Sequence, residues 1–81
     1  MIKWQPRHRW EEVADDVRQR ILAGEYPPRT TIPAIPRLMQ KYEIGRNTAL
    51  HVVKALVEQG LVVVLPSKGT FVVPPEDRPE S

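Results

Sequence analysis

Nine prolines divide the sequence, and they cluster at positions where secondary-structure elements are expected to end. The first long segment without proline runs from Trp10 to Gly24. Acidic residues fall early in this segment and Arg18 and Arg20 fall late, an order that suits the dipole of a helix. Its apolar residues recur at steps of three and four, as on one face of a helix; they are Trp10, Val13, Ala14, Val17, Ile21 and Leu22. We therefore predict an amphipathic helix that Gly24 terminates.

The next segment is a proline-rich connector over residues 26–33, with room for one short strand around Thr30–Ile32. A brief helix is expected from Ile35 to Tyr42. Pro36 suits its first turn, because an amide hydrogen there has no helical partner to lose.

A tight turn over residues 43–45 leads into a longer helix from Arg46 to Gln59, which Gly60 ends. Its core-facing residues are expected to be Ala49, Val52, Val53 and Leu56. A short helix, a tight turn and a second helix in this order predict a helix-turn-helix.

After Gly60 the hydrophobic period changes. Residues 61–65 are apolar and β-branched, residues 66–69 contain turn formers, and residues 70–73 are again apolar, a pattern that predicts a β-hairpin. Residues 74–81 are polar and rich in proline, and we expect a disordered tail there.

The predicted fold class is α+β, mainly α: a three-helix winged helix-turn-helix with a C-terminal two-stranded β-hairpin as the wing. We expect a basic N-terminal arm over residues 1–9, the winged helix-turn-helix over 10–73 and the tail over 74–81. A chain of 81 residues without cysteine forms one domain that no disulfide stabilises.

Composition excludes several classes of function. The two histidines have no carboxylate at a ligand spacing, so neither a metal site nor a cofactor is expected, and no catalytic set of residues indicates an enzyme. No signal peptide or apolar run of about 20 residues is present, which favours a cytoplasmic protein. The net charge of +2 is unevenly distributed: residues 29–72 carry +4, whereas residues 11–28 carry −3. This asymmetry is typical of a protein with one phosphate-binding face.

The second helix of a helix-turn-helix fits the major groove of duplex DNA, and its first turn meets the base edges. Arg46 can form hydrogen bonds to both O6 and N7 of guanine, and Asn47 to both N6 and N7 of adenine. Thr48 and Lys54 suit phosphate contacts. His51 is expected to face the groove with them. Without this setting, the same residues would be an ordinary solvated helix start.

The wing tip offers a positive charge at Lys68 and a close backbone approach at Gly69, with Thr70 beside them. A plain hairpin turn is the alternative interpretation, because glycine there can serve a positive φ alone. The basic residues of the N-terminal arm can contact phosphates or the minor groove, or belong to an ordinary basic terminus; they are Lys3, Arg7 and Arg9.

Leu50 lies on the predicted groove-facing surface and is apolar. It can touch the methyl group of thymine or contact a protein partner. The apolar run over residues 61–65 leaves the same question open, because a two-stranded wing has only one core-facing side. Apolar side chains on its other face would suggest a surface for a protein partner or a dimer. A winged-helix module for protein–protein interaction is therefore the alternative function.

The ordered set of segments resembles the GntR family of bacterial transcriptional regulators over roughly residues 10–73. Residues 10–28 are similar to the family's opening helix, and Ile32-Pro33 to its Leu-Pro step. Residues 46–62, with Arg46-Asn47-Thr48 at their start, resemble its recognition helix and exit, and Lys68-Gly69-Thr70-Phe71-Val72 resembles its wing. The resemblance implies sequence-specific binding of double-stranded operator DNA by a regulator that represses rather than activates. Two copies, possible as a homodimer, are expected on a palindromic or repeated site, because a lone module buries little surface.

Several positions depart from the family pattern. Ala34-Ile35-Pro36 replaces Ser-Glu-Arg, which removes a DNA-contacting arginine and leaves the adjacent Arg37 as the candidate to replace it. Gly45 replaces the serine cap of the recognition helix, Leu50 replaces an arginine, and Glu43 replaces a turn glycine. The family's effector-binding domain is missing from the chain, so no small-molecule effector is expected. The chain is either a shortened piece of a longer regulator or a naturally minimal one, and the native-looking Met1 start and the acidic, proline-rich end slightly favour the second.

Overall fold

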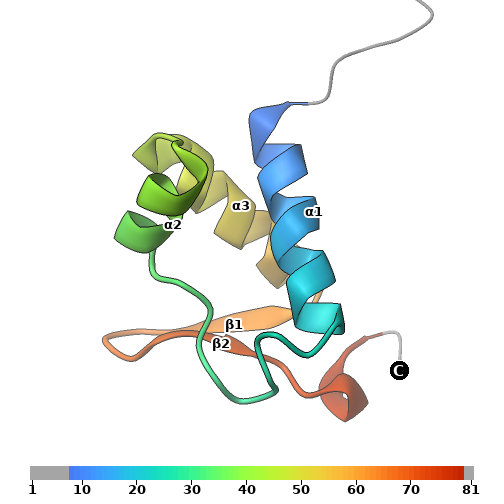
Figure 1. Ribbon diagram of the computed structural model, residues 1–81. Coiled ribbons are helices and arrows are strands. Elements are labelled where there is room, and N and C mark those ends of the chain that lie inside the picture. The colour runs from blue at the N-terminus through green and yellow to red at the C-terminus, as the bar shows by residue number, and fades with distance from the viewer. Residues whose placement is uncertain (1–7, 80–81) are drawn as a thin grey trace, which may run out of the picture.

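The structure is a computed structural model that describes residues 8–79. Three α-helices come first: α1 (Arg9–Leu22), α2 (Ile35–Tyr42) and α3 (Arg46–Glu58). Two antiparallel strands follow, β1 (Val62–Leu65) and β2 (Gly69–Val72), and then a short 3₁₀ helix (Pro75–Asp77). Figure 1 shows the helices gathered above the hairpin. The fold class expected from the sequence, three helices with a C-terminal hairpin, is confirmed.

All three helices end in the same way, with a residue of positive φ just after the last turn. The positions are Gly24, Glu43 and Gly60, with φ values of 85°, 53° and 77°. In α3, the Gly60 N–H donates to the Val57 carbonyl and the Leu61 N–H to the Leu56 carbonyl, which is the pattern of a Schellman motif. Gly24 and Gly60 terminate their helices as the sequence predicts.

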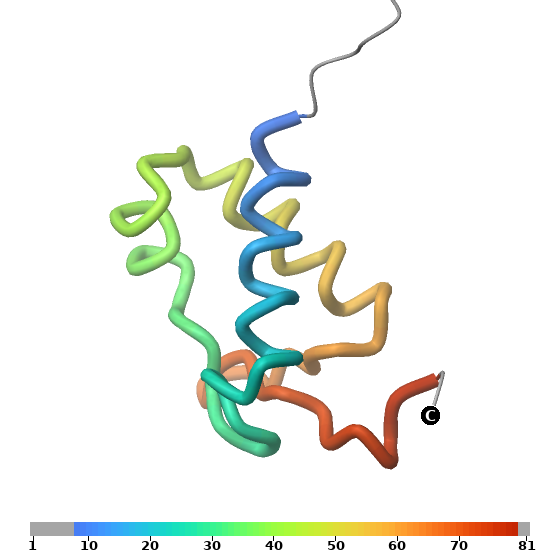
Figure 2. Tube along the Cα trace, turned by 45° about the vertical axis from the view of Figure 1, so that its right-hand side comes forward, coloured from blue at the N-terminus to red at the C-terminus, as the bar shows by residue number. Residues whose placement is uncertain are grey.

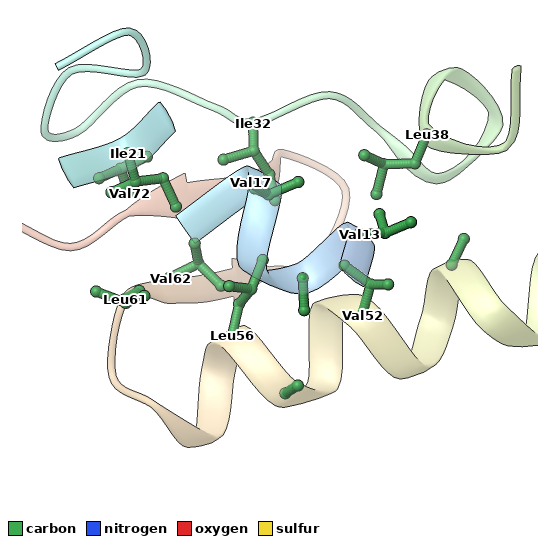
Figure 3. Close-up of a cluster of buried hydrophobic side chains, with 13 residues drawn as sticks. Val13, Val17, Ile21, Ile32, Leu38, Val52, Leu56, Leu61, Val62 and Val72 are labelled. Atoms are coloured by element: carbon green, nitrogen blue, oxygen red, sulfur yellow. The ribbon is translucent and has the colours of Figure 1, made fainter. Parts of the chain in front are cut away.

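One apolar cluster holds the three helices and the hairpin together. The buried face of α1 consists of Val13, Ala14, Val17 and Ile21, and it packs against α3, which α1 crosses in Figure 2. Leu38 of α2 and Ile32 of the connector close the cluster from the other side (Figure 3). Leu22, which the sequence assigned to the apolar face of α1, is instead exposed at the end of that helix.

One residue of the connector pairs with the two-stranded hairpin. Thr31 forms an isolated antiparallel bridge to Phe71, and the Ile32 N–H donates to the Thr70 carbonyl at 3.0 Å. The strand expected around Thr30–Ile32 is thus present as a single bridge. It places β2 between Thr31 and β1, so that β1 is an outer strand of the sheet.

A side-chain clamp joins α1 to α2. The Tyr42 hydroxyl donates to the Asp16 carboxylate at 2.7 Å, and the Arg20 guanidinium donates to the same oxygen at 2.9 Å. These two donors lower the pKa of Asp16, while burial and the Asp16 carboxylate raise the pKa of Tyr42. A lowered carboxyl pKa means that the clamp stabilises the fold at neutral pH and loses this contribution only as the pH falls through that pKa.

The tail differs from the disordered segment that the sequence predicted. The Arg78 Nε donates to the Val73 carbonyl at 3.0 Å, and Pro79 packs so closely on Gly60 that a Cβ at residue 60 would collide with the proline ring. Pro74 precedes the 3₁₀ helix and Pro75 begins it, and both favour this bend because their φ angles are already fixed. Polar composition alone does not reveal such a docking site on a glycine far away in the sequence.

Replacing Glu43 by glycine tests the strain at the end of α2. A non-glycine residue in the left-handed region lowers the stability of the fold by about 1–2 kcal/mol. Glycine avoids this strain, but its larger conformational entropy in the unfolded chain cancels part of the gain. We expect Glu43→Gly to raise the free energy of unfolding by up to about 1 kcal/mol in urea titrations. Glu43→Ala, which removes the carboxylate but keeps the strain, should gain little. A glycine variant less stable than the parent would contradict this account.

Candidate nucleic-acid interface

The outward face of α3 carries a row of exposed residues that we call the α3 ridge: Arg46, Asn47, Leu50 and Lys54. Residues 46, 50 and 54 are spaced by four, so they follow one another along the helix surface. On the opposite side, Ala49, Val52 and Leu56 are completely buried. The rotation of α3 about its own axis is therefore fixed by its core contacts, and the ridge must face outward.

The two cations of the ridge have no ionic partner in the part of the chain that the structure describes. Within residues 8–79, neither Arg46 nor Lys54 makes a hydrogen bond or ion pair with another side chain. The first turn of α3 contains no acidic residue, and Gly45 supplies no side-chain cap to its free N–H groups. Uncapped amides at the positive end of a helix dipole are donors suited to an anion. The start of α3 thus combines full positive charges with oriented backbone donors.

Two of the predicted site residues of α3 are placed differently from the ridge. His51, expected to face a DNA groove, stacks on the Trp10 ring of α1, with ring centroids 4.0 Å apart and planes inclined by 18°. The reason is its position, one residue beyond Leu50, which turns it by about 100° toward α1. Thr48 is half-buried at the edge of the core. His51 therefore braces α3 against α1 through its ring face, although the residue is exposed, and its predicted contact with a DNA groove stays a prediction.

The hairpin tip supplies the second part of the predicted site. Lys68 is exposed, and its backbone N–H donates to the Leu65 carbonyl across the turn. Gly69 has two local reasons to be glycine: its φ is 122°, and a Cβ there would lie 3.2 Å from the Thr31 methyl group. Thr70 is half-buried in β2. The structure thus explains Gly69 by the packing of the hairpin itself, whereas Lys68 projects freely.

Arg37 and the hairpin tip lie on the same side of the molecule as the start of α3. Arg37 is exposed in the first turn of α2, and no described side chain pairs with it. In Figure 1, α2, the start of α3 and the hairpin tip all occupy the left-hand side. The elements that carry the exposed Arg37, Arg46 and Lys68 therefore lie on one side of the domain.

Of the three basic residues named for the predicted N-terminal arm, the structure describes Arg9. Lys3 and Arg7 lie outside the described residues. Arg9 belongs to α1 rather than to an arm: its guanidinium donates to the Tyr42 carbonyl at 2.9 Å and lies 3.7 Å from the Glu12 carboxylate. Arg9 thus satisfies a carbonyl at the end of α2, which corrects the predicted boundary of the arm at residue 9.

A hollow of about 550 Å³ lies at the far end of α3 from the ridge. Gln59 at the end of α3, Arg18 and Leu22 of α1, and Arg78 of the tail contribute to its lining. Arg18 is already paired with Asp15 at 2.7 Å. Among residues 8–79 there is no cluster of histidine, cysteine and acidic side chains that could hold a metal ion, and no helix is long and apolar enough to cross a membrane.

Comparison with known proteins agrees with this geometry. The model of the family described as "Bacterial regulatory proteins, gntR family" matches residues 9–72. The uncharacterized HTH-type transcriptional regulator YieP of Escherichia coli is 37% identical over 62 residues, which are 76% of this chain and 27% of that protein. The histidine utilization repressor of Klebsiella aerogenes is 30% identical over 80 residues, 94% of this chain and 33% of its own. The chain thus spans about a third or less of the length of these relatives.

A solved structure shows the same fold bound to DNA. The DNA-binding domain of AraR in complex with operator ORE1 superimposes with a TM-score of 0.84 at 27% identity, covering 90% of this chain and 89% of that one. The family consists of transcription regulators and not of enzymes. Because the family model matches most of its length, the chain belongs to the gntR family of bacterial regulatory proteins.

Proposed function

We propose that this chain binds double-stranded operator DNA in a sequence-specific manner and regulates transcription as a repressor. The observation that carries the proposal is the pair of cations Arg46 and Lys54, on the outward face of the second helix of a helix-turn-helix, with which no side chain of residues 8–79 pairs. In this arrangement α3 enters the major groove, where Arg46 and Asn47 reach base edges and Lys54 contacts phosphate.

Arg37 and Lys68 extend the same interface. In this proposal Arg37, in the first turn of α2, contacts the phosphates that flank the groove, and Lys68 contacts the backbone or the minor groove beyond it. Thr48 and Thr70, both half-buried, add hydroxyl donors at the margins. The AraR domain bound to its operator and the relatives that are named as repressors support this assignment.

Binding as two copies on a palindromic or repeated site would give the chain a higher affinity than one domain alone can provide. One winged-helix domain of this size buries little surface on DNA, and single modules of this kind bind weakly. Two domains that are held by one operator add their contacts, so that affinity and specificity both rise. We propose this arrangement for the DNA complex, with the two copies related by the symmetry of the site.

Replacing Arg46 by alanine tests the role of the ridge. Loss of a bidentate contact to guanine should cost about 1–3 kcal/mol of binding free energy and relax specificity at one base. Titration of the variant on duplexes that differ at single positions measures both effects. Arg18→Ala is the matched control, since it removes the same charge near the far end of α3. If Arg46→Ala binds every sequence as the parent does, α3 does not read the bases.

A protein-interaction module is the second candidate function. Val63, Val64 and Leu65 of the outer strand β1 are between 40% and 50% exposed, which is unusual for a run of three apolar residues. Their apolar surface, together with the exposed edge of the strand, suits a protein surface better than a polyanion.

Salt dependence separates the two functions. A DNA complex with about six phosphate contacts should lose roughly a thousandfold in affinity between 50 and 200 mM salt, because counterions are released on binding. Binding through valine and leucine should hardly change. Affinity for DNA measured by fluorescence anisotropy over this range decides between them: a flat response would remove the support for phosphate contacts and favour the protein partner.

A further inference from the structure

We propose that Leu50 recognises the 5-methyl group of a pyrimidine in the major groove, so that the chain distinguishes thymine from uracil and 5-methylcytosine from cytosine. This inference rests on the proposed DNA binding and adds to it the chemical feature that is read. Leu50 is an apolar residue in a place where a polar one would be expected. Leu50 is 43% exposed at the centre of the α3 ridge.

The neighbours of Leu50 determine what can cover it. Arg46 lies four residues before it and Lys54 four residues after it, so both cations stand within one turn on the same face. Glu58, the next residue in this series and the first acid along α3, lies two turns beyond Leu50. An apolar protein surface that covered Leu50 would have to leave two unpaired cations desolvated, which is costly. A duplex groove, lined by phosphates on both sides, satisfies the cations and accepts the leucine together.

The length of the side chains then assigns a role to each. Arginine and lysine reach outward to the rims of a groove or to a guanine edge, whereas leucine extends only a short distance from the helix. Leucine can therefore contact only what lies directly under the axis of α3, at the floor of the groove. The apolar group that base pairs present in the major groove is the methyl group on C5 of thymine, and 5-methylcytosine presents it at the same position.

The consequence is discrimination without a hydrogen bond. Burial of one methyl-sized group corresponds to about a fourfold change in affinity. Leu50 cannot distinguish bases by donor or acceptor pattern, because it has neither group. It is a specificity-determining residue that acts through contact area, beside Arg46 and Asn47, which act through hydrogen bonds.

The test begins with a selection of bound fragments from a random duplex library by the intact chain. In the enriched site, each thymine is then replaced singly by uracil, which removes only the methyl group, and each cytosine by 5-methylcytosine, which adds it. Affinities are measured for the parent, for Leu50→Ala and for Val57→Ala. Val57 is the matched control, since it is an apolar residue of similar exposure, 41%, two turns further along the same helix.

We expect one replacement position in each half of the site at which the parent changes its affinity about fourfold in favour of the methylated base. A thymine position identifies thymine as the source of the methyl group, and a cytosine position identifies methylated cytosine. Leu50→Ala should bind both forms equally, while Val57→Ala should keep the discrimination. Unfolding midpoints (Tm) of both variants that equal the Tm of the parent show that the fold is intact.

Two results would overturn the inference. One is an enriched site at which no methyl exchange changes the affinity of the parent by more than twofold; the other is discrimination that persists in Leu50→Ala. Both leave sequence-specific DNA binding in place, so they concern Leu50 alone. Failure to enrich any site would instead overturn the proposed function, and the inference with it.

Discussion

The packing of α3 against α1 is the constraint on which the rest of the structure depends. Val52 and Leu56 of α3 and Val13 and Val17 of α1 are almost completely buried and lie in one cluster (Figure 3). Rotating α3 by one residue in one direction would bring His51 and Lys54 into this cluster, and burial of an unpaired charge costs far more than any surface contact returns. The opposite rotation would put Leu50 in the place of Ala49, and overpacking a filled core is also destabilising. The core therefore decides which residues α3 presents to solvent, and the α3 ridge is a direct result of it.

The sequence predicted the elements whose signals are local. Helix periodicity, the two glycines at the ends of α1 and α3 and the change of period after Gly60 each depend on neighbours within a few residues, and all three helices appear where these signals place them. The outward position of Arg46, Asn47 and Lys54 followed from the same periodicity. The buried Ala55 and the exposed Leu22 were not expected. Periodicity defines the apolar face of a helix, but it does not show how much of that face a neighbouring element covers.

Features that depend on how distant elements meet could not be predicted. The stack of His51 on Trp10 and the bond from Tyr42 to Asp16 join residues 41 and 26 positions apart. Neither residue pair carries a sequence pattern that identifies it. The docking of Pro79 on Gly60 belongs to the same class, and the tail composition there indicated the opposite. These contacts brace the ends of α1, α2 and α3 and so fix how the proposed interface is held.

One side of the domain is expected to meet DNA, and mapping the contact residue by residue tests this most directly. In an NMR titration with a selected duplex, backbone amide shifts should concentrate at Arg37, at residues 46–54 and at the hairpin tip near Lys68. The hollow near Arg18 and Arg78 at the other end of α3 should stay unchanged. Shifts concentrated around that hollow, or on the outer strand β1, with an unaffected α3 would contradict the claim that the α3 ridge is the binding surface.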